Sequence, residues 1–364
     1  MLGTAEQLWG VRVIRLYAHM QGSFATVSLG LQEAFEDLEV LSGFHVGEQL
    51  EFDSEPVGGC DAPVAVVVGS PMRVLMAHVQ GQHKEVWLML APNSEGIPPA
   101  MKAQLLEKAP SGEPLVTGFL APSYWAQRVL EREFPDHPVV LCQHGLLQEF
   151  RKTPTLWKVG IEVAKPPFAL HFTSSGLSRK CTQELINIWP EVVRNGFSVN
   201  KLVILSNPMF KPQIEEMIQD PEHVVVFNGQ HAKLMELFTI YTQASLVIQP
   251  SRAEGFGLVP LEARACGTPV VMTRGTGHED HCRTPTEKGC WRILPRGLEE
   301  SDDYWGAQAP AVLQEDVAEG VTSALASLER LSKEAIEVAP QIREHWTWKA
   351  GAQEFVNRMQ EKYV

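Results

Sequence analysis

Short runs of β-branched and other apolar residues alternate along this chain with longer stretches in which apolar residues recur at helical spacing. Such alternation is typical of a parallel sheet whose strands are joined by helices. Many of the runs are apolar without interruption, as expected for strands that helices cover on both faces. We predict strands at residues 11–16, 64–68, 86–90, 115–120 and 139–142, and in the second half at 168–172, 202–205, 224–227, 246–249 and 270–272.

The succession of strands repeats in the two halves of the chain, and between residues 138 and 167 the pattern loosens and prolines accumulate. This indicates a hinge between two Rossmann-like α/β domains, residues 1–165 and 166–340. Since open α/β sheets bind ligands at the carboxyl ends of their strands, two such domains facing each other would form a binding cleft. Residues 341–364 predict a C-terminal helix, which packs either on its own domain or back on the first domain.

Composition narrows the class of protein. The 364 residues are 44% hydrophobic and 21% charged, which fits a soluble globular chain, and the net charge of −13 weighs against a broad nucleic-acid surface. We find no signal peptide and no apolar run of about 18 residues, so we predict no membrane-spanning segment. The six cysteines lack paired spacing, and we expect them to be reduced thiols of a cytoplasmic protein.

Residues 250–271 carry the most specific pattern. Glu254 and Glu262 are separated by seven residues, and Gly255 and Gly257 lie between them. Glycines let the backbone approach a ligand closely, and a helix N-terminus presents N–H groups to phosphate. Carboxylates accept hydrogen bonds from sugar hydroxyls. The combination predicts a site for a phosphorylated, hydroxyl-rich ligand.

The local structure of this segment follows from its prolines and glycines. Pro260 fits the first turn of a helix, Gly267 fits the left-handed position after its end, and Pro269 prevents its continuation. We therefore expect Glu254 in a loop and Glu262 in the first helical turn. The alternative is that Glu262 only complements the helix dipole and that the glycines are ordinary turn residues.

This string closely resembles the E-x7-E signature of retaining glycosyltransferases of the GT-B fold, family 4. Residues 224–229 and 244–251 resemble the family's preceding segments, so the similarity covers most of the second half. The first half agrees more loosely, at residues 93–98, 121–125 and 139–146. Residues 346–355 resemble the crossover helix that returns to the first domain in this fold.

The resemblance implies a retaining glycosyltransferase that takes a sugar from a nucleotide-sugar, UDP- or GDP-linked, by a metal-independent front-face mechanism. The nucleotide-sugar is a substrate, and no cofactor is implied. Glu262 would bind the ribose hydroxyls and Glu254 a hydroxyl of the donor sugar. The N–H groups of Phe256, Gly257 and Leu258 would approach the diphosphate or sugar.

Breaking a glycosyl–phosphate bond leaves negative charge on the diphosphate, which cations must stabilise. Residues 174–181 partly match the family's G-R-x4-K-G segment, and Lys180 falls on its lysine. The usual arginine falls near Ser175 and the second glycine is Cys181, so Arg179 would supply the other charge from a shifted position. The alternative is that both cations simply lie at the start of a helix. The chain has no Asp-x-Asp triplet, and we predict no metal ion.

Three further residues are candidates for this site. Gly22 lies in a turn after the first strand, in a loop that lies against donor phosphate in the resembling family. Glu95 follows the strand at 86–90 and would orient an acceptor hydroxyl or stabilise positive charge on the sugar, unless it is only a solvated loop residue. His278 lies in a loop that borders the donor sugar in that family, and the cluster at 278–282 also allows a metal reading.

Two other functions stay open, a nucleotide-sugar epimerase of the GT-B fold and a non-catalytic module that binds a nucleotide-sugar. The close E-x7-E match argues against the epimerase, and the departures at Ser175 and Cys181 keep the module open. The acceptor is undetermined: small molecules, lipid-linked intermediates, protein side chains and modified DNA bases are all compatible with the sequence.

Overall fold

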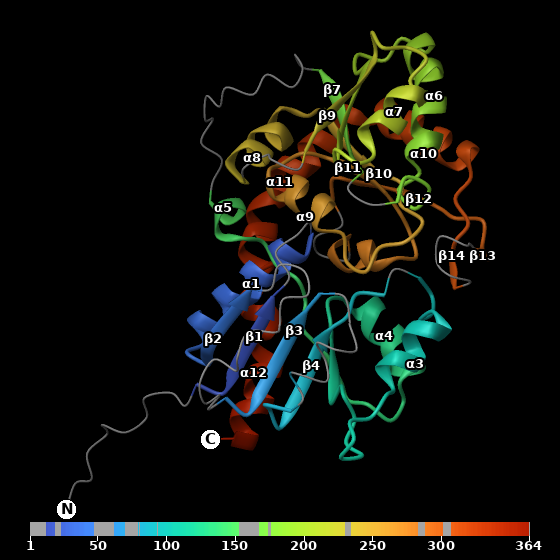
Figure 1. The fold of residues 1–364 in the computed structure, drawn as a ribbon. Helices are drawn as coiled ribbons and strands as arrows, with labels where there is room; N and C mark the ends of the chain where they lie inside the picture. The colour runs from blue at the N-terminus through green and yellow to red at the C-terminus, as the bar shows by residue number, and fades with distance from the viewer. Residues whose placement is uncertain are drawn as a thin grey trace, which may run out of the picture. The chain divides into compact units, whose positions relative to one another are not determined.

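The computed structural model describes residues 12–18, 23–46, 62–69, 79, 81–92, 94–152, 167–173, 176–229, 234–282, 288–300 and 307–363. The chain divides into two compact α/β units, each built on a six-stranded sheet (Figure 1). The first unit contains Met1–Pro92, Ile97–Leu147 and Thr347–Val364, and the second contains Asn93–Gly96 and Gln148–Trp346. The predicted boundary at residues 165 and 166 lies outside the described residues.

The first unit has a wholly parallel sheet with the order β2-β1-β3-β4-β5-β6. Its central strands are buried along their whole length, because helices cover the sheet and leave no face for polar side chains. The strands are β1 (Ile14–Ala18), β2 (Leu41–Val46), β3 (Val64–Val68), β4 (Glu85–Met89), β5 (Gly118–Ala121) and β6 (Val139–Leu141). The helices are α1 (Ser23–Asp37), α3 (Pro99–Leu105), α4 (Tyr124–Glu133) and α12 (Trp348–Tyr363).

Helix α12, at the end of the chain, belongs to this first unit and packs on α1. Its buried face includes Phe355, Val356 and Met359, as the spacing predicts. The Phe355 ring lies 5.2 Å from that of Trp87 between centroids. Glu85 of β4 accepts a 2.8 Å hydrogen bond from the Tyr363 hydroxyl and pairs with Lys362. Helix α12 is therefore part of the first unit's core, and polar contacts tie its last turn to β4.

The second unit has a parallel sheet with the order β12-β11-β10-β7-β8-β9 and a small antiparallel pair, β13-β14. The strands are β7 (Phe168–Thr173), β8 (Lys201–Ser206), β9 (Val224–Asn228), β10 (Leu246–Gln249), β11 (Val270–Thr273), β12 (Cys290–Ile293), β13 (Leu298–Glu300) and β14 (Gln308–Pro310). The helices are α5 (Gln148–Arg151), α6 (Thr182–Arg194), α7 (Lys211–Met217), α8 (Leu234–Gln243), α9 (Leu258–Ala265), the 3₁₀ helix η1 (Gly277–Cys282), α10 (Gln314–Ala326) and α11 (Leu328–His345).

In the second sheet, β8 and β9 follow β7 on one side, and β11 and β12 follow β10 on the other side. The neighbours β7 and β10 are thus the point at which the strand order reverses. Loops that leave the carboxyl ends of two such strands diverge, and ligands bind in the space that this creates. The residues after β7 and β10 are therefore the first place to look for a site.

All ten predicted strands exist, with ends that differ by a few residues, but β2, β12, β13 and β14 were missed. The strands β2 and β12 lie at sheet edges. Edge strands keep polar residues and glycines because one side of them is not paired, so the continuous apolar signal is lost. The sequence Leu41–Val46 contains serine, glycine and histidine, and Cys290–Ile293 contains arginine.

The contact of α1 with α12 gives a test of the fold. Gly30 of α1 faces the Trp348 ring so closely that an added Cβ would overlap it. We expect Gly30→Ala to lower the free energy of unfolding by about 1–3 kcal/mol through overpacking, although glycine to alanine inside a helix usually stabilises by about 0.5–1 kcal/mol. Urea denaturation measures the change. Leu29→Ala, at a neighbouring exposed position, is the control and should stay within about 0.5 kcal/mol; a stabilising Gly30→Ala would contradict this packing.

Candidate active site

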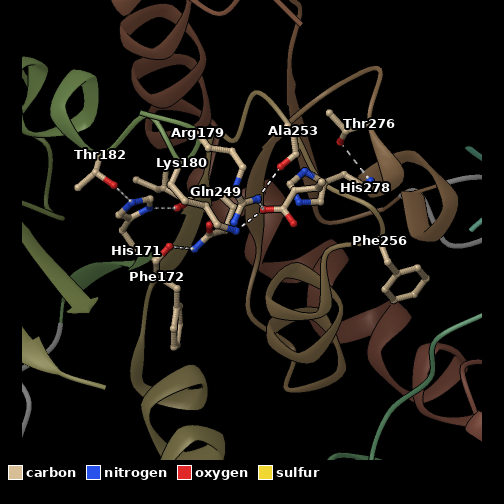
Figure 2. Close-up of polar contacts among 12 residues, drawn as sticks. His171, Phe172, Arg179, Lys180, Thr182, Gln249, Ala253, Phe256, Thr276 and His278 are labelled. Carbon is tan, nitrogen blue, oxygen red and sulfur yellow. Dashed lines mark hydrogen bonds and ion pairs between the residues drawn. The ribbon is translucent and has the colours of Figure 1, made fainter. Parts of the chain in front are cut away.

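The predicted cations and the first carboxylate meet where the strand order of the second sheet reverses. Arg179 and Lys180 follow β7, and Glu254 follows β10, the neighbouring strand (Figure 2). Glu254 pairs with Lys180 through its Oε1 atom, and Arg179 Nη1 reaches the same oxygen at 3.1 Å. Their side chains are only 10–15% exposed. Two cations thus share one carboxylate in this ion cluster.

Burial and charge oppose each other in this cluster. Burial alone would raise the pKa of Glu254, but the charges of Lys180 and Arg179 outweigh it and hold the pKa well below its usual range. Burial lowers the pKa of Lys180 to about 8, in spite of the attraction of Glu254 and with some repulsion from Arg179. At neutral pH the carboxylate is therefore ionised and Lys180 is mostly protonated.

The turn that carries the two cations is held by backbone contacts and by a further arginine. Arg179 Nη1 donates a 2.7 Å hydrogen bond to the Ala253 carbonyl. Arg252 donates from its backbone N–H to the Arg179 carbonyl at 2.9 Å and from its guanidinium to the Ser178 carbonyl at 2.6 Å. Arg252 also pairs with Glu184 of α6 at 2.7 Å. The loop after β10 and the loop after β7 are consequently one connected structure.

Cys181 explains one departure of the sequence from the family pattern. It stands where the resembling motif has glycine, and its backbone has a φ of 51°, in the left-handed region that favours glycine. The thiol is buried, and α6 begins directly after it. The turn therefore keeps the backbone conformation typical of glycine although a cysteine occupies it. Lys180, the residue directly before it, contacts Glu254.

The second glycine of the E-x7-E segment, Gly257, allows a close contact with His278. Gly257 has a φ of 90° and precedes the first residue of α9, and a Cβ here would overlap the His278 ring. Gly277 in turn lies against the backbone of Gly255, and its N–H donates to the Glu254 carbonyl at 2.7 Å. The loop after β10 and the segment after β11 thus pack backbone to backbone, and this places His278 beside the ion cluster.

His278 is neutral at physiological pH, because burial lowers its pKa to about 4 in spite of the attraction of Glu254. It can therefore contribute a hydrogen bond but no charge. The nearby buried atoms Gln249 Oε1, Ser251 Oγ and Thr273 Oγ1 have no hydrogen-bond partner among the described residues. Buried polar atoms rarely stay unsatisfied, so these groups are suited to a polar ligand or to water.

The second carboxylate lies in a different environment from the first. Glu262 is the fifth residue of α9, so it lies one residue beyond the predicted first helical turn. It is buried and accepts a 2.8 Å hydrogen bond on Oε2 from the Tyr241 hydroxyl. Burial raises its pKa to about 7, and the bond from Tyr241 only partly offsets this. Glu262 is therefore suited to accept hydrogen bonds rather than to hold cations.

Phe256 has a side chain that does not line the site. It is buried, and its ring contacts those of His281 and Trp346, with centroids 5.4 and 5.7 Å away. The ring anchors the loop, so a ligand role predicted for Phe256 is confined to its backbone N–H. Leu258 is the first residue of α9, and its N–H belongs to a helix terminus that favours anions.

The candidates predicted in the first half have different outcomes. Gly22 lies outside the described residues. Glu95 was predicted on the first-domain side, but the structure groups it with the second unit, where its N–H donates to the Gln308 carbonyl of β14 at 2.7 Å. The reason is the turn after β4, which leaves the first sheet before α3 begins.

The segment at 278–282 is where the prediction of reduced cysteines fails. The structure joins Cys282 to Cys290 in a disulfide, since η1 ends beside the start of β12. Cys142, Cys181 and Cys266 are buried free thiols. His281 is buried against Phe256. Among the described residues no three His, Cys, Asp or Glu side chains are grouped to hold a metal ion.

Known proteins resemble part of this chain in sequence. Residues 209–355 match a family described as Family 4 Glycosyltransferase in conflict systems. The match covers the second unit from α7 onward and the first part of α12, and over this part the chain is similar to that family. It is 60% identical over 42 residues to the D-inositol 3-phosphate glycosyltransferase of Corynebacterium jeikeium, and 67% identical over 62 residues to D-inositol 3-phosphate glycosyltransferase 1 of Catenulispora acidiphila. These matches cover 12% and 17% of this chain, and 10% and 14% of the relatives' own length.

Two solved structures show that the GT-B likeness extends over the whole chain. Sucrose-phosphate synthase of Thermosynechococcus elongatus aligns with a TM-score of 0.63 at 13% identity, over 97% of this chain and 99% of its own. Anabaena HepE, solved with UDP and glucose, aligns with a TM-score of 0.64 at 13% identity, over 98% and 100%. At this identity the likeness establishes the fold. Within the described residues no helix has the length and apolarity to cross a bilayer.

Three residues that shape the site were not predicted: Tyr241, Arg252 and Gln249. Tyr241 and Arg252 were within reach of sequence reasoning, because a tyrosine in an apolar helix and an arginine beside the first carboxylate both need polar partners. Gln249 ends a buried strand, where a polar side chain is itself a signal. These side chains position the others and are recognised only when their partners are known.

The Gly257–His278 contact yields a stability test with a matched control. We expect Gly257→Ala to lower the free energy of unfolding by about 1–2 kcal/mol for the left-handed backbone and by a further 1–3 kcal/mol, roughly, for the overlap with the ring. Gly196→Ala, in the same unit with a φ of 69° and open space around it, should show the backbone cost alone. Chemical denaturation measures both; equal losses would show that His278 does not pack on Gly257.

The ion cluster yields a second test. We expect Glu254→Gln to cost about 3–5 kcal/mol at pH 7, because two buried cations lose their counter-charge. Deprotonation of Lys180 would limit the loss. The control is Glu215→Gln, which removes an exposed i,i+4 pair with Lys211 and should cost less than about 1 kcal/mol. If denaturation shows the two variants to be equally stable, the cluster is not the buried network described here.

Proposed function

We propose that this protein is a glycosyltransferase that moves a sugar from a nucleotide-sugar to an acceptor hydroxyl, with retention at the anomeric carbon and without a metal ion. The observation that carries the proposal is the buried ion cluster at the carboxyl ends of β7 and β10. It has two cations for one carboxylate and lies at the reversal of strand order, where α/β sheets bind nucleotides.

Two adjacent cations suit a diphosphate. Lys180 and Arg179 are nearly buried, so their attraction for phosphate oxygens is screened less than at a surface. The N-terminus of α9 adds N–H groups at Leu258. When the glycosyl–phosphate bond breaks, these groups stabilise the new charge on the leaving diphosphate, as a divalent cation does in other transferases.

The two carboxylates take different parts of the donor in this proposal. Glu254, ionised and next to the cations, accepts a hydrogen bond from a hydroxyl of the transferred sugar. Glu262, buried in α9, accepts from the ribose hydroxyls. His278 is neutral and lies against Gly257, where it can bond to the sugar.

Retention by front-face attack agrees with the acid–base character of these groups. Glu254 is held by cations with its pKa far below neutrality, and His278 has a pKa of about 4, so both are weak bases. A phosphate oxygen of the leaving diphosphate then accepts the proton of the acceptor hydroxyl. The new bond forms between the acceptor oxygen and the anomeric carbon as the bond to the phosphate oxygen breaks.

The solved neighbours indicate which donors to test first. HepE was solved with UDP and glucose, and a pneumococcal O-GlcNAc transferase, GtfA, with UDP and GlcNAc. We therefore propose a UDP-sugar, with GDP-sugars as the alternative. The acceptor stays open among small molecules, lipid-linked intermediates, protein side chains and modified DNA bases.

The departure at Cys181 from the family pattern keeps a non-catalytic binding module open in the sequence. The left-handed backbone of Cys181 keeps Lys180 in contact with Glu254, so the departure gives that alternative no support. An epimerase would convert the donor to a second nucleotide-sugar without an acceptor, and chromatography of a donor-only incubation detects it.

A thermal-shift screen with UDP- and GDP-sugars tests the proposed donor site. A ligand at a hundred times its Kd adds about 2.7 kcal/mol to the free energy of unfolding. We therefore expect one class of donor to raise the melting temperature of the protein by several degrees. Glu262→Ala should remove the shift, since it deletes the acceptor for the ribose hydroxyls. Glu191→Ala, at an exposed position on α6, is the control and should keep it. A protein that responds to no nucleotide-sugar would refute the proposal.

A further inference from the structure

Tyr241 occupies a position in α8 that packing alone does not explain. It is completely buried, and its ring lies against those of Phe172 and Phe150, with centroids 5.3 and 6.0 Å away. Its backbone is fixed by Thr268, whose hydroxyl donates a 2.6 Å hydrogen bond to the Tyr241 carbonyl. A phenylalanine would fill this aromatic site without a hydroxyl to satisfy.

The hydroxyl of Tyr241 has one directed partner, the Oε2 atom of Glu262 at 2.8 Å. Burial and the Glu262 charge raise the pKa of Tyr241 well above its usual value, so it stays protonated and acts as a donor. A hydrogen bond given to a carboxylate stabilises the ionised form and fixes the direction of its oxygens. One oxygen of Glu262 is thereby held from within the unit.

We propose that Tyr241 is the positioning residue of Glu262: its hydroxyl holds Oε2, which favours the ionised carboxylate and orients it to accept the ribose hydroxyls of the donor. The role toward the ribose rests on the proposed function. The effect of Tyr241 on the Glu262 carboxyl does not rest on the proposed function, because this contact is present without a ligand.

The surroundings of Glu262 leave Tyr241 as its main stabilising contact. Burial raises the pKa of Glu262 to about 7, and the hydrogen bond from Tyr241 is the opposing influence. Strands β10 and β11 carry no ionisable residue. At the end of α9 the Cys266 thiol has its pKa raised by burial and by Glu262. Helix α9 itself also carries Arg264. On the neighbouring helices, Arg343 of α11 donates to the Ala265 carbonyl at 2.6 Å and acts on Cys266. The other ionisable residues of these helices are Glu329, Arg330, Lys333, Glu334, Glu337, Glu344 and His345 of α11, Glu149 and Arg151 of α5, and Glu236 of α8. None of them is among the influences that shift the pKa of Glu262.

A pH dependence follows from this arrangement. The pKa of Glu262 is higher in the folded protein than in the unfolded chain, so its contribution to stability is full below about pH 4.5 and is lost as pH rises through about 7. Ribose binding requires the ionised form, so nucleotide affinity rises over the upper part of the same range. Without the Tyr241 hydroxyl both midpoints should move upward by about one pH unit, the size expected for a hydrogen bond to a charged group.

The test compares wild type, Tyr241→Phe, Glu262→Gln and Phe172→Leu from pH 5 to 8. Urea denaturation gives the pH at which stability falls. Calorimetric titration gives the Kd for UDP, with GDP as the second probe, at each pH. Glu262→Gln supplies the baseline, because the phosphate of the nucleotide and Lys180 titrate in every variant. Phe172→Leu disturbs the packing of the Tyr241 ring without removing its hydroxyl.

We expect Tyr241→Phe to shift the Glu262-dependent midpoint of stability upward and to weaken UDP binding at pH 7 by about threefold to tenfold, with recovery toward wild-type affinity near pH 8. Phe172→Leu should lower stability without moving the midpoint. A Tyr241→Phe variant that is less stable but has an unchanged midpoint would overturn the proposal and leave a purely structural role.

The two proposals fail in different ways. If neither UDP nor GDP binds wild type, the proposed function fails, and the role of Tyr241 toward ribose fails with it. If nucleotide binding is lost in Glu262→Gln while Tyr241→Phe has the wild-type pH profile, the donor site stands and the positioning role is overturned.

Discussion

The site depends on one interaction, the sharing of the Glu254 carboxylate by Lys180 and Arg179 in a nearly buried place. Burial makes each of these charges costly unless it is paired. The surrounding fold holds the cluster together, and its two adjacent cations are suited to a ligand that brings negative charge. The proposal of a diphosphate donor rests on this arrangement.

The sheet and its loops create this cluster by bringing together residues about 75 positions apart in the chain. The reversal of strand order puts the ends of β7 and β10 side by side. Lys180 lies directly before the left-handed backbone of Cys181. Gly257 has no Cβ and so leaves room for the His278 ring. Arg252 ties both loops to α6. Each of these features is local, and together they form the proposed donor site.

The sequence was sufficient to predict the two parallel sheets and the residues of the cluster, because buried parallel strands are continuous apolar runs and the E-x7-E segment is specific. It missed the edge strands β2 and β12, whose polar residues conceal their pairing. It placed Glu262 in the first turn of its helix, one residue from its position at the start of the second turn. The partnership of Tyr241 with Glu262, and the Cys282–Cys290 disulfide, depend on distances across the fold that no spacing in the chain reveals. Glu95 was assigned to the wrong unit because a turn, not a strand, decides its contacts.

The most direct test of the central claim is a calorimetric titration of UDP into wild type, Lys180→Met and Lys201→Met at pH 7. Lys201 begins β8 at the opposite, amino-terminal edge of the same sheet and is exposed, so its replacement removes the same charge far from the site. The account predicts that Lys180→Met weakens binding at least about tenfold, the effect of 1.4 kcal/mol, and that Lys201→Met binds like wild type. Equal affinity of all three proteins for UDP would contradict the assignment of the ion cluster to the donor diphosphate.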